Sequence, residues 1–206
     1  MKKVIYFLIF LLISNFVLAQ NSGVDYLSSV KIPPPGYTPQ GDNSTIVTIN
    51  GFDNYFLGND FGEPYIAVNP TDPKKQVCAY NTNSFYCTQN GIDWVRTYPT
   101  FGPYQQVLGD PVMAYNKEGV LFYVTLYSPN LSSGPWGIAV AKSTDNGVTW
   151  SNYYQAHQTT LQLADKEWVA IDQTNGPYSG NIYIGWRQYG TTGMGFIRSI
   201  DQGATW

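Results

Sequence analysis

The 206-residue chain is 43% hydrophobic, 16% aromatic and only 12% charged. This composition supplies a packed core and excludes wholesale disorder. The formal net charge of −3 leaves no basic surplus to neutralise phosphates, which argues against a nucleic-acid partner. Two cysteines are too few for a disulfide-dense scaffold or a four-cysteine zinc site, and we expect no metal ligand set.

The N-terminus has the pattern of a secretory signal peptide over residues 1–19. Lys2 and Lys3 precede the apolar run Val4–Leu12, and Ala19 is a small residue suited to cleavage. The run is short for a transmembrane span, and no later stretch is apolar enough for one. We therefore expect a secreted protein, extracellular or periplasmic, with no membrane span after signal removal.

Residues 20–59 form a polar, turn-rich lead-in, and the chain then repeats. The lead-in contains one expected strand over residues 44–49. Two copies of the pattern S-x-D-x-G-x-T-W begin at residues 143 and 199, and a degenerate copy begins at Cys87, which gives a spacing of 56 residues each time. The two full copies contain Ser143, Asp145, Gly147, Thr149 and Trp150, then Ser199, Asp201, Gly203, Thr205 and Trp206. A fixed period of this length is typical of repeat architectures.

Short runs rich in β-branched and aromatic residues surround each copy and predict strands. Four such runs per repeat predict an all-β fold, a β-propeller with blades at about 60–104, 109–157 and 165–206. Three blades, the last without its fourth strand, do not close a ring, so we expect an incomplete arc and a fragment.

Each residue type that the two copies of the motif share has a structural explanation. The Asp carboxylate can accept backbone N–H bonds in the turn, and the Gly permits positive φ. The two hydroxyls can join the ends of the turn, and the Trp can bury a large apolar surface. We therefore interpret Asp145 and Asp201 as structural, with Gln89 and Cys87 replacing the Asp and Ser in the degenerate copy.

The motif resembles the Asp-box, or BNR repeat, of sialidase-like β-propellers. The segments Gly62–Pro70 and Asp165–Asp172 resemble those of exported bacterial sialidase-like proteins, and the resemblance covers residues 60–206. It implies a propeller and, for an enzyme, a glycoside hydrolase resembling exo-α-sialidase. It fixes the fold more strongly than the activity, because non-enzymatic propellers carry the same motif.

The chain departs from the sialidase pattern in its arginines. The family uses three arginines to bind the substrate carboxylate and has an Arg-Ile-Pro motif, for which Lys31-Ile32-Pro33 is the nearest sequence here. A lysine cannot supply the bidentate fork of arginine. Two function classes stay open: a glycan-directed hydrolase, and a non-catalytic module that binds carbohydrate or protein. We expect a glycan or glycoprotein ligand and no cofactor, with a protein ligand as the alternative for the non-catalytic module.

The two cysteines suggest a disulfide. Cys78 and Cys87 are symmetric about a turn between Thr82 and Asn83, so a two-residue loop would place them directly opposite. Export would permit oxidation. Two buried free thiols are the alternative.

Acidic residues precede the first strand of each repeat, and blade topology predicts that they converge on the face opposite the Asp-boxes. The catalytic candidates are Asp110, Asp165 and Glu167, and the ligand-binding candidates are Asp60, Glu63, Lys166, Trp168 and Trp186. Clustered carboxylates repel, which raises the pKa of some and suits acid–base chemistry. A bound cation on this face, or plain solvated loop acids, are alternative interpretations.

Overall fold

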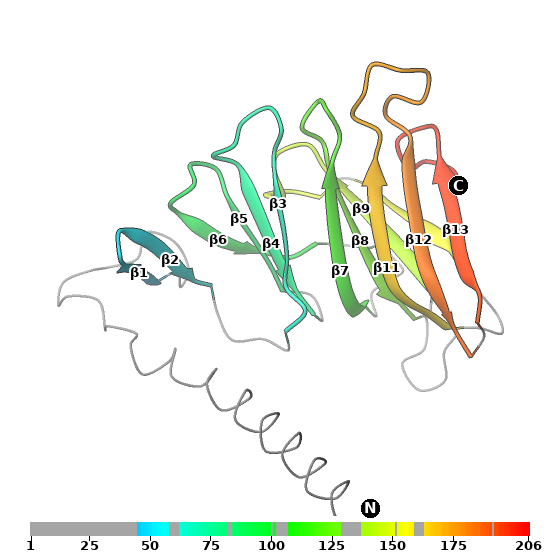
Figure 1. Cartoon of the computed structure of the whole chain (residues 1–206), viewed down its shortest axis with the longest axis horizontal. Coiled ribbons are helices and arrows are strands. Elements are labelled where there is room, and N and C mark those ends of the chain that lie inside the picture. Colours follow the sequence, from blue (N-terminus) through cyan, green and yellow to red (C-terminus); the bar gives the residue numbers. More distant parts are fainter. Residues whose placement is uncertain are drawn as a thin grey trace, which may run out of the picture. The chain divides into compact units, whose positions relative to one another are not determined.

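The computed structural model describes residues 45–57, 62–81, 84–99, 101, 107–128, 137–150, 152–158, 163–190 and 192–206. The signal peptide, the start of the lead-in, Lys31 and Asp60 lie outside these residues. In the described part every regular element is a β-strand, so the all-β prediction is confirmed (Figure 1).

A small hairpin lies in a compact unit separate from the larger sheets and is described by itself. Strand β1 (Thr45–Ile49) pairs with β2 (Phe52–Phe56). Asn50 and Gly51 between them both have positive φ, 54° and 82°, the conformation that tight hairpins require. The strand expected over residues 44–49 is present, whereas β2 was not predicted.

The second unit holds three antiparallel sheets, each in simple chain order. The first sheet contains β3 (Tyr65–Val68), β4 (Gln76–Tyr80), β5 (Ser84–Thr88) and β6 (Trp94–Thr97). The second contains β7 (Val107–Tyr115), β8 (Leu121–Tyr127), β9 (Gly137–Ser143) and β10 (Asn152–His157). The third contains β11 (Leu163–Ile171), β12 (Ile182–Tyr189) and β13 (Met194–Ser199).

The first strands of the three sheets lie next to one another. Strand β7 contacts both β3 and β11, and the three run in the same direction (Figure 1). Apolar side chains fill the space between the first and second sheets, among them Phe85 and Tyr123. A second cluster, with Phe122 and Ile184, fills the space between the second and third sheets. The middle sheet is therefore covered on both faces, and every residue of β8 is buried.

Each full Asp-box is a turn closed by its own side chains. Asp145 Oδ1 accepts bonds from Ser143 Oγ and from the Thr149 amide, both at 2.8 Å, and its Oδ2 accepts one from Thr149 Oγ1 at 2.5 Å. Asp201 makes the same three bonds to Ser199 and Thr205. The structural roles predicted for the motif are confirmed.

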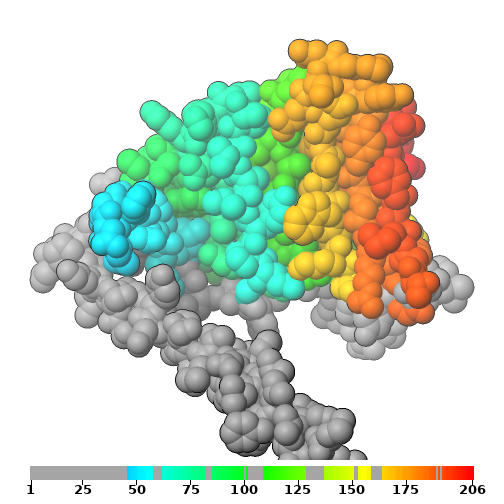
Figure 2. All heavy atoms as spheres, viewed as in Figure 1, coloured from blue at the N-terminus to red at the C-terminus, as the bar shows by residue number. Residues whose placement is uncertain are grey.

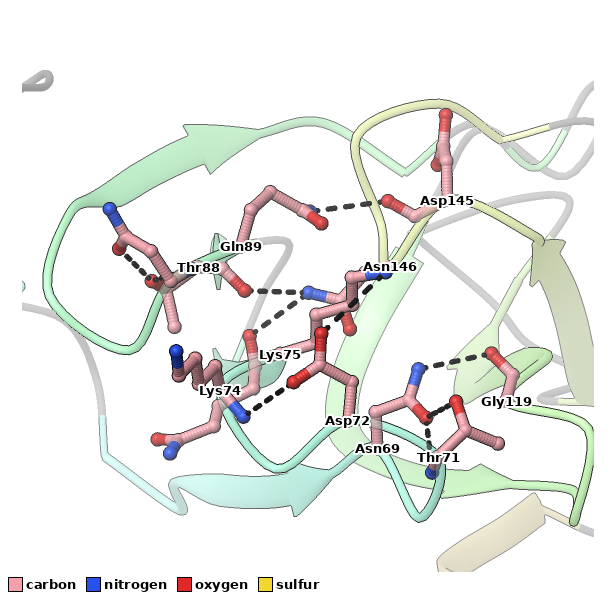
Figure 3. A network of polar contacts seen from close by, with 12 residues as sticks. Asn69, Thr71, Asp72, Lys74, Lys75, Thr88, Gln89, Gly119, Asp145 and Asn146 are labelled. Carbon is pink, nitrogen blue, oxygen red and sulfur yellow. Dashed lines mark hydrogen bonds and ion pairs between the residues drawn. The ribbon is translucent and has the colours of Figure 1, made fainter.

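The Asp-box of the second sheet also docks on the first sheet (Figure 3). Asn146 Nδ2 donates to the carbonyl of Thr88 at 2.8 Å, and Gln89 Nε2 donates to the carbonyl of Asp145 at 3.2 Å. A Cβ on Gly147 would lie 2.4 Å from the Phe85 ring, so only glycine allows this approach. Trp150 then packs edge-on against Phe85 with ring centroids 4.9 Å apart.

The Asp-box of the third sheet also contacts the second sheet, through different bonds. Gln202 and Asn146 occupy the same motif position, and both have left-handed backbones. Lys142 Nζ donates to Gln202 Oε1 at 2.9 Å. Gly203 lies against Phe122 and Tyr154 of the second sheet. The motif is therefore a joint between successive sheets as well as a closed turn.

The degenerate copy uses different residues from those predicted. Thr88 Oγ1, rather than Cys87, accepts the amide of Gly91 at 3.0 Å. Asn90 Oδ1, rather than a group of Gln89, accepts the amides of Ile92 and Asp93. The turn is one residue shorter than the full motif, so alignment on Gly91 and Trp94 misplaced the residues before them.

The predicted disulfide is wrong, because both cysteines are free and buried. Cys78 lies opposite Tyr86, and Cys87 lies opposite Val77. The β4–β5 loop contains three residues rather than two, and this shifts the register by one position. A one-residue shift turns a side chain to the other face of the sheet, so the two sulfur atoms point away from each other.

Replacing Asp145 with Ala should lower the free energy of unfolding by about 1–3 kcal/mol, because amide and hydroxyl donors in the turn lose their acceptor. Urea denaturation measures the change. Asp145→Asn is the matched control and should lose less, since Asn90 already fills this position in the first sheet. Equal stability of the Ala variant and the unchanged protein would show that the turn does not hold the sheets together.

The register of β4 and β5 predicts two free thiols. Protein unfolded without a reductant should be alkylated by iodoacetamide at both Cys78 and Cys87, and peptide mass spectrometry measures this. The folded protein should react slowly, because both thiols are buried. A Cys78–Cys87 linked peptide in the unreduced sample would contradict the register.

Candidate functional site

A residue with positive φ occurs near the start of the first strand of each of the three sheets, β3, β7 and β11. Glu63, Asp110 and Lys166 have φ values of 50°, 53° and 49°. Residues other than glycine seldom adopt this left-handed conformation, and it costs of order 1–2 kcal/mol at each position. In β7 and β11 the residue lies in a β-bulge, where the register with the neighbouring strand shifts.

A bulge re-aims a side chain out of the sheet pattern, and here the three side chains meet. Lys166 Nζ lies 3.0 Å from Glu63 Oε1. The carboxyl groups of Glu63 and Asp110 are close enough for each to shift the pKa of the other. Figure 2 shows the turquoise atoms of the first sheet next to the gold atoms of the third on this face.

Asn81, in the turn after β4, joins the same cluster. Its Nδ2 donates to Glu63 Oε2 at 2.6 Å, and its Oδ1 accepts the backbone N–H of Asp110 at 2.5 Å. The sequence reasoning missed this residue, although Asn81 directly follows a predicted strand. Nothing in the sequence distinguishes Asn81 from the other asparagines expected in turns.

The two contacting carboxyl groups have very different proton affinities. Hydrogen bonds from Asp110, Lys166 and Asn81 lower the pKa of Glu63 to about 2. Burial and the neighbouring Glu63 raise the pKa of Asp110 to about 6. Burial alone would lower the pKa of Lys166, but its hydrogen bond to Glu63 and the nearby acids raise it. Below pH 6 the pair therefore shares one proton, held mainly by Asp110.

Apolar side chains surround these charges and complete a pocket of about 170 Å³. We call it the strand-start pocket; it is lined by Glu63, Pro64, Tyr65, Asp110, Pro111, Val112, Lys166 and Trp168. The Trp168 side chain is 58% exposed, and its ring meets Tyr65 edge-on at 5.8 Å. An exposed indole beside charged groups is an adequate contact surface for a ligand with one apolar face.

Trp186, the other aromatic candidate, is a core residue. It is only 3% exposed, and its ring lies 4.4 Å from that of His157, the last residue of β10. No ligand could stack on a side chain buried in this way. The prediction of Trp186 as a ligand-binding residue is therefore wrong.

Glu167 lies directly behind the pocket and is fully buried. Neither of its carboxylate oxygens has a hydrogen-bond partner, and its exposed fraction is 0%. Burial raises its pKa well above the usual value, and the nearby charge of Asp110 adds to the rise. The raised pKa favours the protonated form of this buried acid, and Glu167 does not line the pocket. Tyr123 OH, also fully buried, has no partner either.

Asp165 faces away from this cluster into an ion pair of its own. Its Oδ2 lies 3.3 Å from Arg187 Nη1 of the neighbouring strand. Of the candidates within the described residues, the structure therefore brings together Glu63, Asp110, Lys166 and Trp168, places Glu167 behind them, and leaves Asp165 and Trp186 apart.

The pocket and the Asp-boxes lie at opposite ends of the sheets. Tyr65, just after Glu63, pairs with Ala79 at one end of β4, whereas Gln76 at the other end pairs with Thr88 of the first Asp-box turn. The pocket and the contacts between sheets are therefore formed by different residues.

Two further searches cover the described residues only. Among them no three His, Cys, Asp or Glu side chains lie close enough to hold a metal ion. Within the same ranges no helix is long and apolar enough to cross a membrane.

Comparison with known proteins supports the fold and is silent on activity. No known protein family and no curated protein matches the sequence. A crystal structure of a protein of unknown function from Dyadobacter fermentans DSM 18053 is similar, with a TM-score of 0.57 and 15% sequence identity. The similarity covers 79% of this chain and 56% of that protein, so this chain spans a little over half of that protein's length.

Burial of Glu167 predicts an unusual dependence of stability on pH. Because burial raises the pKa of this carboxyl, the folded protein holds the proton to a higher pH than the unfolded chain, which releases it around the ordinary pKa near 4.5. Stability from this group is therefore present below pH 4.5 and is lost as the pH rises towards the folded pKa. Glu167→Gln should remove up to about 1.4 kcal/mol per pH unit from that slope.

Urea denaturation between pH 4.5 and 8 measures the slopes, and comparing slopes cancels any constant cost of the substitution. Asp110→Asn should remove a smaller part of the slope, ending near pH 6. Parallel curves for Glu167→Gln and the unchanged protein would mean that Glu167 is ionised in the folded state.

Proposed function

We propose that this chain is an exported Asp-box protein of the β-propeller type that binds a neutral saccharide in the strand-start pocket. Three repeated antiparallel sheets whose first strands lie side by side support the propeller class. The observation that carries the binding proposal is the convergence of Glu63, Asp110 and Lys166 beside the exposed Trp168.

The chemistry of the pocket suits a sugar ring. Hydroxyl groups both donate and accept, so they can pair with a carboxylate and with an ammonium group alike. The C–H face of a pyranose is apolar and can lie on the Trp168 indole. The volume of about 170 Å³ is below the ~300–1,000 Å³ of typical ligand pockets, and it favours a single terminal ring over an internal stretch of polymer.

An anionic sugar fits less well. The two carboxyl groups would repel a sialic acid carboxylate, and Lys166 is already paired with Glu63. The lining of this pocket includes no arginine, and of the described arginines, Arg187 pairs with Asp165. This favours a neutral ligand over the substrate that the sialidase resemblance implies.

Glycoside hydrolysis is the second candidate, and the divergent pKa values of Glu63 and Asp110 favour it. Groups whose proton affinities are pushed apart can act as base and acid. Glycosidases, however, generally place two carboxyl groups about 5–9.5 Å apart across the bond. Asn81 bonds both Glu63 and the Asp110 amide, and the two carboxyl groups shift each other's pKa, an arrangement closer than the one that places a glycosidic bond between two carboxyl groups. We therefore place binding before hydrolysis.

Saturation-transfer NMR tests the proposal with glucose, galactose, xylose, N-acetylglucosamine and sialic acid as probes. A neutral sugar should give signals, and Trp168→Ala should weaken its binding about tenfold, the equivalent of ~1.4 kcal/mol of lost contact. Asp110→Asn should weaken binding as well, measured well below the melting temperature of each variant.

Tyr178→Ala is the matched control, because Tyr178 is an exposed aromatic residue in the β11–β12 loop and does not line the pocket. Stronger binding of sialic acid than of every neutral sugar, or equal loss in the control variant, would contradict the proposal. Release of nitrophenol from aryl glycosides that disappears in Asp110→Asn would favour the hydrolase instead.

A further inference from the structure

We infer that Asn81 is the positioning residue of the strand-start pocket: it holds Glu63 and Asp110 in contact and keeps Glu63 the ionised member of the pair. This inference rests on the proposed function, since the groups that Asn81 orients are those of the proposed ligand site.

The hydrogen bonds of Asn81 have one consistent arrangement. Its Oδ1 accepts the Asp110 amide, and its Nδ2 donates to Glu63 Oε2. Flipping the side-chain amide would set an NH₂ group against an N–H and an oxygen against a carboxylate, and both contacts would be repulsive. The Asn81 backbone N–H also donates to the carbonyl of Gly62 at 3.1 Å, which fixes the turn beside Glu63.

The Oδ1 atom of Asn81 supplies a hydrogen-bond acceptor for a backbone N–H in the bulge of β7. A β-bulge leaves an extra residue outside the ladder of strand pairing. Asp110 is that residue in β7, between the pairs Gly109↔Leu126 and Val112↔Val124. Its N–H points to Asn81 of the first sheet, so the left-handed conformation of Asp110 is supported from outside its own sheet.

The Nδ2 group of Asn81 favours one location for the proton that Glu63 and Asp110 share. An amide N–H donates only, so it stabilises a carboxylate rather than a carboxylic acid. Asn81 donates to one oxygen of Glu63 and Lys166 to the other. Glu63 is therefore held ionised, and the proton remains on Asp110. The other titratable groups around the pair are Tyr65 on β3 and Glu167 on β11, whose pKa is raised by burial. Asp165 is paired with Arg187.

Carboxyl-carbon NMR of ¹³C-labelled protein, without ligand, tests this inference directly. In the unchanged protein Glu63 and Asp110 should titrate in two well-separated steps. Asn81→Ala removes both hydrogen bonds and should narrow the gap between the steps by about one pH unit or more. Asn81→Asp keeps an acceptor for the Asp110 N–H but loses the donor to Glu63, so it should raise the Glu63 midpoint with less disturbance of the fold.

Asn175→Ala is the matched control, since Asn175 accepts a bond from Lys117 in an exposed loop and should leave both steps unchanged. An unchanged Glu63 midpoint in Asn81→Asp would overturn the inference, even if the Ala variant did not fold.

The second readout is the affinity for the neutral sugar that binds best to the unchanged protein. Asn81→Ala or Asn81→Asp should weaken it about fivefold or more, as expected for the loss of one charge-assisted hydrogen bond. Shifted titrations with unchanged affinity would overturn the positioning role. Absence of sugar binding by any variant would reject the proposed function, while the titrations would still decide what Asn81 does to the carboxyl pair.

Discussion

The docking of each Asp-box turn on the preceding sheet is the contact on which the rest of the structure depends. The turn is closed by its own aspartate, so it presents a rigid surface to the next sheet. Its glycine permits the close approach, and its tryptophan fills the space between the two sheets. The Asp-box one repeat later also contacts the preceding sheet, at Gln202 and Gly203, so this turn lies between successive sheets in both cases.

This repeated relationship brings the inner strands together and so creates the pocket. Equivalent positions on β3, β7 and β11 meet at one point, and each carries a residue in the left-handed region. The three positions hold Glu63, Asp110 and Lys166, so one structural position supplies both signs of charge. The residue that follows is proline in the first two sheets and Glu167 in the third. The third sheet therefore buries an acid where the others have a proline ring. The three left-handed residues therefore all lie at the lining of the pocket.

The sequence was sufficient to predict the features that depend on residue type and period. The 56-residue spacing, the short strands and the internal bonds of the full Asp-boxes all follow from local patterns. So does part of the gathering at the pocket: acids at or near the start of each first strand were expected to converge, and Glu63 and Asp110 do, with Lys166 beside them.

The sequence was not sufficient where a single residue of register decides the outcome. One extra residue in the β4–β5 loop turns Cys78 and Cys87 to opposite faces, and one missing residue in the first Asp-box moves its roles to Thr88 and Asn90. Neither change has a signal in composition or spacing. The burial of Glu167 and of Trp186 likewise depends on the packing of the second and third sheets, and the bridging role of Asn81 depends on contact between the first and second sheets.

The central claim is that the first and third sheets meet at the pocket, and zero-length crosslinking tests it most directly. Carbodiimide activates a carboxyl group and joins it to an amine only when the two are in contact, as Lys166 Nζ and Glu63 Oε1 are at 3.0 Å. Peptide mass spectrometry should find the peptide of Lys166 joined to that of Glu63 or Asp110, and Lys166→Arg should abolish the link. Recovery of both peptides unlinked, while the ion pair of Lys75 and Asp72 reacts, would contradict the account.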